Sequence, residues 1–102
     1  MTQHFFALIE NLRLRKNMYV YPNEYYALSN FINGYDFAIK ETTGHSIIES
    51  FRLWLQKKVN HNFSTDAFTY IFNYMTESNN QQAEELLFNL LKEYQISLNT
   101  NT

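Results

Sequence analysis

The sequence predicts an all-α protein made of about five helices, and three observations support this class. Apolar residues recur at the i, i+3, i+4, i+7 spacing of amphipathic helices. The chain has only two glycines and one proline, too few turn residues for a protein built from many short strands. Of its 102 residues, 45% are hydrophobic and 18% aromatic, enough for one buried core. We therefore expect a single compact helical domain over residues 1–102, an antiparallel bundle or orthogonal array, with residues 97–102 as a frayed tail.

The first helix is expected from Gln3 to Lys16, and an extended connector over residues 17–22 follows it. Basic residues gather at the end of this helix, where cations match the negative end of the helix dipole. In the connector, Tyr19 and Tyr21 alternate with two apolar residues, so one pair packs on the protein and the other faces away. The apolar stripe of the helix is Phe5, Ile9 and Leu12, and the apolar pair of the connector is Met18 and Val20.

The second helix is expected from Glu24 to Glu41, with Asn23 as its cap. Asn33 and Gly34 could instead form a hairpin turn, but their flanks lack the alternation that a hairpin needs. We prefer an uninterrupted helix, which accepts a cost of about 1 kcal/mol for the glycine, and such a glycine often allows the close approach of another helix. The buried stripe is Tyr25, Leu28, Ile32, Tyr35 and Ile39, and the solvent face is Ser29, Asn33, Asp36 and Lys40.

Three further helices follow. Residues 42–44 end the second helix, and Ser46 can cap a third that runs to about Asn60 and pairs Glu49 with Arg52 on its outer face. Ser64 or Thr65 starts a fourth helix, residues 66–77, whose inward residues are Phe68, Ile71, Phe72 and Met75. After the polar residues 78–80, the last helix carries the clearest amphipathic pattern, formed by Ala83, Leu86, Leu87, Leu90, Leu91 and Tyr94.

Composition and spacing argue against several classes of function. The net charge is −2, and the basic residues fall in two separate clusters, which disfavours nucleic-acid binding. The chain has no cysteine, and its three histidines lack the spacing of metal ligands. Phosphate-binding glycine loops and local catalytic signatures are also missing. We therefore expect no enzyme activity, no metal, no cofactor and no membrane partner, and, since neither a signal peptide nor a spanning segment is evident, a cytoplasmic protein.

One face of the fourth helix is a candidate binding surface. Opposite its apolar stripe lie two tyrosines at i, i+4 with polar neighbours: Tyr70, Asn73, Tyr74 and Glu77. Exposed tyrosines give a large contact area at little entropic cost and are enriched at protein interfaces. The alternative is that this helix is central and covered on both sides, with the hydroxyl groups reaching the rim.

The connector and the second and third helices carry a pattern of short motifs. A basic residue precedes a Met-Tyr step, a hydrophobic-Asn-Gly-Tyr step lies within the second helix, and a Phe-x-x-Trp-Leu step lies within the third. The residues are Lys16, Met18, Tyr19, Ile32, Asn33, Gly34, Tyr35, Phe51, Trp54 and Leu55. This pattern, over about residues 12–94, resembles the small helical immunity proteins of bacterial contact-dependent growth inhibition systems.

The resemblance implies a protein with no reaction of its own. It would bind the toxic C-terminal domain of a cognate effector in the cytoplasm and cover its active site or substrate-binding face. Such toxins are often nucleases with basic clefts, which acidic residues would complement. The implied partner-binding residues are Asp36, Tyr70, Asn73, Tyr74, Glu77, Glu84 and Glu85, with the tyrosines as anchors. The alternative is a general helical interaction module, or a homodimer through the tyrosine face; a free immunity protein would be a monomer or weak dimer.

Overall fold

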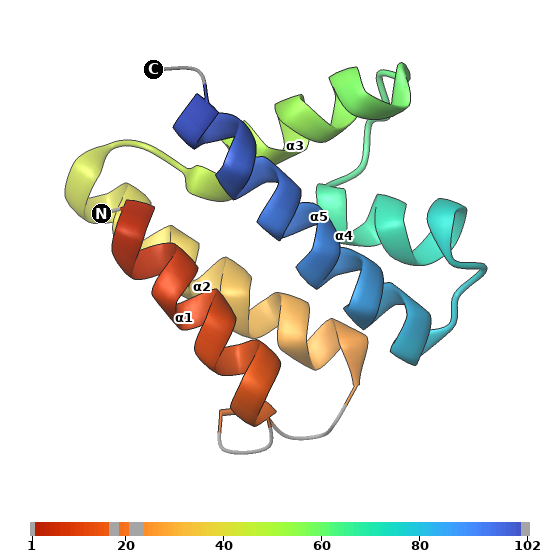
Figure 1. The fold of residues 1–102 in the computed structure, drawn as a ribbon, viewed down its shortest axis with the longest axis horizontal. Helices are drawn as coiled ribbons and strands as arrows, with labels where there is room; N and C mark the ends of the chain where they lie inside the picture. The colour runs from red at the N-terminus through yellow and green to blue at the C-terminus, as the bar shows by residue number, and fades with distance from the viewer. Residues whose placement is uncertain (1, 17–18, 21–23, 101–102) are drawn as a thin grey trace. The chain divides into compact units, whose positions relative to one another are not determined.

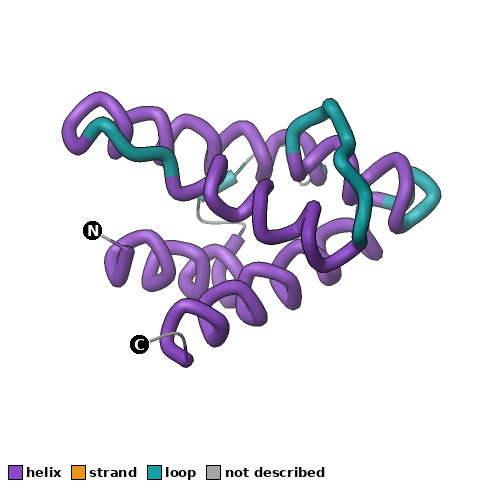
Figure 2. Tube along the Cα trace, turned by 90° about the horizontal axis from the view of Figure 1, so that it is seen from above, coloured by secondary structure: helices purple, strands orange, loops and turns teal. Residues whose placement is uncertain are grey.

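The computed structural model describes residues 2–16, 19–20 and 24–100, which are helices and loops without a strand among them (Figure 1). The helices are α1 (Thr2–Arg15), α2 (Tyr25–Thr43), α3 (Ile47–Val59), α4 (Ala67–Tyr70) and α5 (Asn80–Thr100). A π-helix, η2 (Ile71–Met75), continues α4. Figure 2 shows the short loops between the helices. The all-α class is confirmed, and the chain divides into two compact units, Met1–Ile47 and Ile48–Thr102.

The first unit has a buried stripe on α1, as its apolar spacing predicted. Phe5 and Leu12 are fully buried, and the Phe5 ring meets Phe6 edge-on at 5.3 Å between centroids. In the connector, Val20 is buried, whereas Tyr19 is exposed and its ring lies 6.1 Å from that of Phe31. The apolar side of the connector is therefore the packed one at Val20; Met18 and Tyr21 lie outside the described residues.

Helix α2 is uninterrupted at Gly34, as expected, and ends at Thr43, two residues after the predicted Glu41 and within the segment 42–44 that was expected to end it. The residue after its last turn, Gly44, has a φ of 77°, and its N–H donates to the Lys40 carbonyl at 2.7 Å. A Cβ built at Gly34 would meet no described atom within 4 Å, so close packing does not require the glycine there. Glu24 holds the N-cap position without a side-chain cap bond, and Asn23 lies outside the part of the chain that the structure describes.

The predicted solvent face of α2 is wrong at two residues. Ser29 and Asp36 are each only 7% exposed, while Tyr35 is half-buried. Asp36 is buried because its carboxylate accepts bonds from the chain that follows α2: from the Ile47 N–H at 2.7 Å and from the Ser46 hydroxyl at 2.6 Å. Asp36 therefore accepts the hydrogen bond of the first N–H group of α3, a role that the sequence analysis assigned to Ser46. The buried residues of α2 are Tyr25, Leu28, Ser29, Ile32, Asp36 and Ile39.

The second unit is built on α3 and α5. The predicted pair on the outer face of α3 is present, with Arg52 Nη1 3.1 Å from Glu49 Oε1. Helix α5 continues through Thr100, past residue 97, where the sequence placed the start of the tail. The buried apolar residues of this unit are Ile48, Phe51, Leu55, Phe63, Ala67, Phe68, Ile71, Ala83, Leu87, Phe88, Leu90, Leu91 and Tyr94.

The predicted fourth helix is shorter and differently wound. Its cap is Asp66, whose carboxylate accepts from the Thr69 N–H at 2.9 Å; the predicted caps, Ser64 and Thr65, lie in the preceding loop. After one α-helical turn the chain widens into η2. Buried positions are then five residues apart, at Ile71 and Thr76, and the predicted inward residue Met75 is only half-buried. The i, i+3, i+4 template failed here because a π-helix closes i to i+5 hydrogen bonds.

Candidate functional site

Four rings of the second unit form one aromatic patch, which we define as His61, Phe63, Tyr70 and Tyr74. Phe63 and Tyr70 stack with their centroids 3.9 Å apart and an interplanar angle of 15°. His61 lies 6.1 Å from Tyr70, and Tyr74 lies 5.5 Å from it, so Tyr70 is the centre of the patch. Exposure rises across the patch from Phe63, which is buried, through Tyr70, which is half-buried, to Tyr74, which is 71% exposed.

The loop that carries half of this patch is held by side chains of α3. Arg52 donates from Nη2 to the Phe63 carbonyl at 3.1 Å and from Nε to the Thr65 carbonyl at 3.0 Å. Gln56 donates to the same Phe63 carbonyl at 2.9 Å. Asn60, in the left-handed region with a φ of 56°, ends α3 and turns the chain into the loop. The sequence predicted only the pairing of Arg52 with Glu49, whereas the same guanidinium also holds the loop.

The other half of the patch depends on the change from α4 to η2. Tyr70 ends α4 and Tyr74 lies in η2, on the side away from buried Ile71. The wide turn is closed by Thr76, whose hydroxyl donates to the Ile71 and Phe72 carbonyls at 3.1 Å each. Local π-helical turns are often found at functional sites. Here the π-helix carries Tyr74, which is 71% exposed.

A hollow of about 450 Å³ opens beside the patch. Its floor includes Thr65, whose Oγ1 is buried without a hydrogen-bond partner. A second hollow, of about 360 Å³, shares His61 and Asn62 with the first, so these two residues form the ridge between them. The first hollow is lined by His61, Asn62, Phe63, Ser64, Thr65, Tyr70 and Tyr74, and the second by Leu53, Gln56, Lys57, Asn60, His61 and Asn62.

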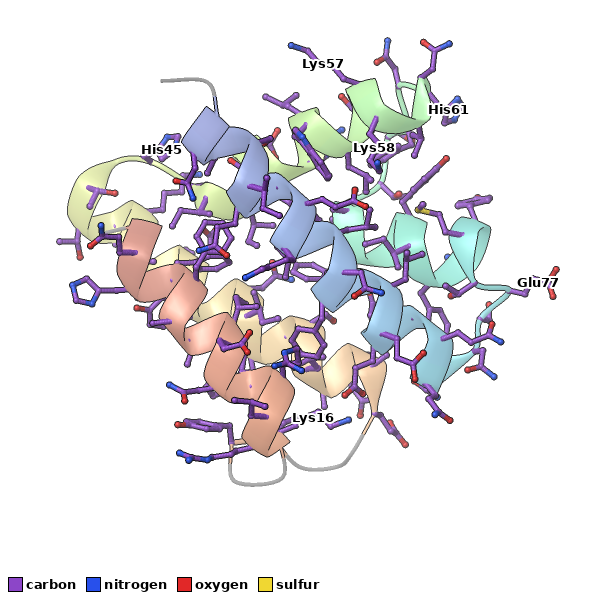
Figure 3. The ribbon with its side chains drawn as sticks, in the orientation of Figure 1. Lys16, His45, Lys57, Lys58, His61 and Glu77 are labelled. Atoms are coloured by element: carbon purple, nitrogen blue, oxygen red, sulfur yellow. The ribbon has the colours of Figure 1, made fainter. Side chains whose placement is uncertain are left out.

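The residues that line the two hollows present ring faces, hydroxyl groups and amides, and their formal charge is positive. None of the residues that line either hollow is acidic, whereas Lys57 lines the second. Figure 3 shows Lys57 and His61 on this edge of the unit. The neighbouring Lys58 is used internally, with its Nζ 2.8 Å from Glu93 and 5.7 Å from the centroid of the Trp54 ring. Such a surface suits stacking and hydrogen bonding to a partner.

The structure brings together only part of the predicted partner-binding set. Tyr70 and Tyr74 lie in the patch, and Asn73 is exposed beside Tyr74. Asp36 is buried in the first unit and is not a surface residue. Glu77 and Glu85 are exposed and Glu84 is half-buried, but they line neither hollow. Glu77 has a φ of 54° and projects from the loop before α5, away from His61 (Figure 3).

Sequence reasoning missed His61 and Phe63. Both lie in a polar segment that reads as a plain loop, residues 60–66. The available signal was a phenylalanine between polar residues, because an apolar ring in a short loop usually packs on a neighbouring element. Stacking of Phe63 on Tyr70 would have followed only from knowing how the loop returns to the fourth helix.

Two further absences hold for the described residues. No group of three or more histidine, aspartate or glutamate side chains among them is placed to hold a metal ion. No helix in the same part of the chain is both long and apolar enough to cross a membrane.

Comparison with known proteins gives no relative on which to base a function. The chain matches no protein-family model, no curated protein and no solved structure.

Proposed function

We propose that this chain is a small binding protein of the immunity type, which recognises the toxic domain of a cognate effector and covers the surface that the toxin needs for its activity. The aromatic patch is the proposed contact surface. The observation that carries the proposal is the exposure of Tyr74, at 71%, on a supporting stack of Tyr70 and Phe63.

The patch is suited to binding because its rings are already in place. Immobilising side chains and loops on association costs free energy, so a surface whose loop is fixed beforehand binds more tightly. Here Arg52 and Gln56 fix the loop through two backbone carbonyls, and stacking fixes Tyr70. Tyrosine anchors surrounded by smaller polar residues, as Asn62, Ser64 and Asn73 surround Tyr74, are typical of interfaces.

We propose a toxin as the partner because the short motifs resemble those of immunity proteins of contact-dependent growth inhibition. For a nuclease toxin with a basic cleft, complementary charge would come from outside the aromatic patch, from Glu77 and Glu85, which are exposed but line neither hollow. Asp36 is left out of the proposed contact set, since its carboxylate is buried and bonded to the start of α3.

The test is a calorimetric titration of this protein with the toxic C-terminal domain encoded next to its gene. A tight one-to-one complex that also abolishes the toxin's activity is expected. Tyr74→Ala should weaken the complex about 30-fold or more, because a central tyrosine anchor contributes at least about 2 kcal/mol to binding. Ile96→Ala is the matched control, since Ile96 is a half-exposed side chain on α5, outside the patch.

Three results would contradict the proposal in different ways. Absence of both heat and protection would reject the toxin as partner. If Tyr74→Ala and Ile96→Ala bind the toxin equally tightly, the immunity function stands but the aromatic patch is not the contact surface. Self-association lost only in Tyr74→Ala would favour the alternative, a homodimer through this face.

A further inference from the structure

The second hollow extends the proposed contact surface beyond the aromatic patch. It has a volume of about 360 Å³ and shares the ridge residues His61 and Asn62 with the first hollow. Its other walls come from the end of α3 and the residue after it, which contribute an apolar side chain, an ammonium group and two amides. These residues are Leu53, Gln56, Lys57 and Asn60. A partner that covers the aromatic patch and the ridge therefore reaches this hollow as well.

Lys57 gives this hollow a charge that the fold does not use. Lys57 is exposed, its side chain projects outward from α3 (Figure 3), and it forms no ion pair with another described residue. The other basic residues of α3 are used internally, since Arg52 bonds Glu49 and the loop, and Lys58 pairs with Glu93. The Lys57 ammonium group is thus available to a carboxylate from outside the chain.

The acidic side chains nearest to this hollow in the sequence are engaged elsewhere. Residues 48–66 contain two of them, Glu49 and Asp66, and neither lines the hollow. Glu49 lies toward the start of α3, where its carboxylate accepts from Arg52 at 3.1 Å. Asp66 accepts from the N–H and from the hydroxyl of Thr69, each at 2.9 Å. Because both carboxylates are bonded within the fold, the lining of the hollow favours an incoming negative group over a positive one.

The carbonyl groups at the end of α3 do not provide a site for a cation instead. The last carbonyls of a helix carry partial negative charge and favour cations when they lack partners. Here the His61 N–H donates to the Gln56 carbonyl at 3.1 Å, and the Asn60 N–H donates to the Lys57 carbonyl at 3.3 Å. These two acceptors already have partners, so the ammonium group remains the main charge that an incoming group meets.

The remaining walls fit a short side chain that ends in a carboxylate. Asn60 and Asn62 are exposed, and their amides can donate to an anion. Leu53 is 49% exposed and offers an apolar contact to an aliphatic stem. We propose that the second hollow receives a glutamate or aspartate side chain of the partner, with its carboxylate paired to Lys57. This assignment rests on the proposed function, because the aromatic patch is what brings the toxin to the hollow, and it adds that the toxin surface facing the patch carries an acidic side chain.

Three soluble probes of equal length test the chemistry of the hollow without the toxin. They are hexaglutamate, hexalysine and the single-stranded oligonucleotide hexathymidylate, each titrated into the protein while NMR follows the backbone amides of residues 53–62. Hexaglutamate should shift these signals saturably and bind Lys57→Gln about fivefold more weakly or worse, whereas hexalysine should not shift them. Absence of a saturable hexaglutamate shift would overturn the proposal. Tighter binding of hexathymidylate would also overturn it and would indicate a nucleic acid as the occupant.

Charge reversal at two lysines of the same unit tests the contact with the toxic domain itself. Lys57→Glu should weaken the complex about tenfold at about 50 mM salt and less at about 500 mM, because salt screens exposed charges. Lys92→Glu is the matched control, since Lys92 is exposed on α5 and lines neither hollow. Circular dichroism checks that both variants fold.

The two experiments separate the acidic contact from the immunity function. A toxin complex that Lys57→Glu and Lys92→Glu weaken equally would overturn the acidic contact, while the immunity function would stand. A protein that binds hexaglutamate through Lys57 but does not bind the toxin would retain the acidic occupant of the hollow and lose the immunity function.

Discussion

Asp36 accepts a hydrogen bond from the backbone N–H of Ile47 at 2.7 Å, so a carboxylate of α2 satisfies the first residue of α3. The first N–H groups of a helix lack partners within the helix, and a negative charge there also interacts favourably with the helix dipole. The Ser46 hydroxyl donates to the same carboxylate at 2.6 Å. One buried acidic side chain of α2 therefore holds Ser46 and Ile47, the residues at which α3 begins.

Replacing Asp36 should lower stability and leave partner binding unchanged. Asp36→Ala removes a charged acceptor and strands a buried N–H, so we expect a loss of about 2–3 kcal/mol in the free energy of unfolding. Asp36→Asn keeps one acceptor oxygen and should lose less. Urea unfolding followed by circular dichroism measures both. An Asp36→Ala variant with native stability but weakened toxin binding would restore the surface role that the sequence suggested.

The two glycines should respond to alanine in opposite directions. Neither position crowds a new Cβ, so backbone conformation decides the outcome. Gly34→Ala within α2 should raise stability by about 0.5–1 kcal/mol, because glycine loses more conformational entropy in a helix than alanine does. Gly44→Ala should lower stability by about 1 kcal/mol, because its φ of 77° lies in the left-handed region that a Cβ disfavours. Thermal unfolding of both variants checks the prediction; shifts of the same sign would contradict it.

Arg52→Lys should loosen the aromatic patch. Arginine reaches the two loop carbonyls and Glu49 from three separate nitrogens, whereas lysine has a single nitrogen in their place. We therefore expect a loss of about 1–2 kcal/mol in the free energy of unfolding and faster amide exchange in residues 60–66. Arg13→Lys is the control, since Arg13 has the same i, i+3 pairing, with Glu10, but on an exposed surface. Native amide exchange in the Arg52→Lys loop would show that the arginine does not hold the patch.

Stability should fall in the alkaline range partly because of Tyr94. Burial raises the pKa of Tyr94, and a hydrogen bond with Ser50 opposes this shift. The folded state thus holds the phenolic proton more tightly than the unfolded chain does. The stabilisation is complete below the unfolded pKa of about 10 and is lost as the pH rises through the folded pKa. Urea unfolding between about pH 8 and about pH 11 should show a smaller decline for Tyr94→Phe than for the unaltered protein, whereas equal declines would reject Tyr94 as a contributor.

Local pattern predicted the helices well where the burial period was that of an α-helix. The stripes of α1 and α5, the stop at Gly44 and the Glu49–Arg52 pair all depend on residues within one or two turns of each other. The fourth helix was harder, because it widens into a π-helix at Ile71, where the Thr76 hydroxyl donates to the Ile71 carbonyl. The patch was found only in part: Tyr70 and Tyr74 were visible as an i, i+4 pair, but His61 and Phe63 join them through a loop.

The sequence by itself determined the all-α class, the order of the helices and most of their apolar faces, because these follow from helical periodicity and the scarcity of turn residues. Tertiary structure decided which polar groups are inside and which rings are outside. Asp36 is buried because donors of the following segment reach its carboxylate, and Phe63 is buried in a stack because the loop that carries it returns to Tyr70. Both outcomes depend on how one segment meets another, which the pattern within a single helix does not encode.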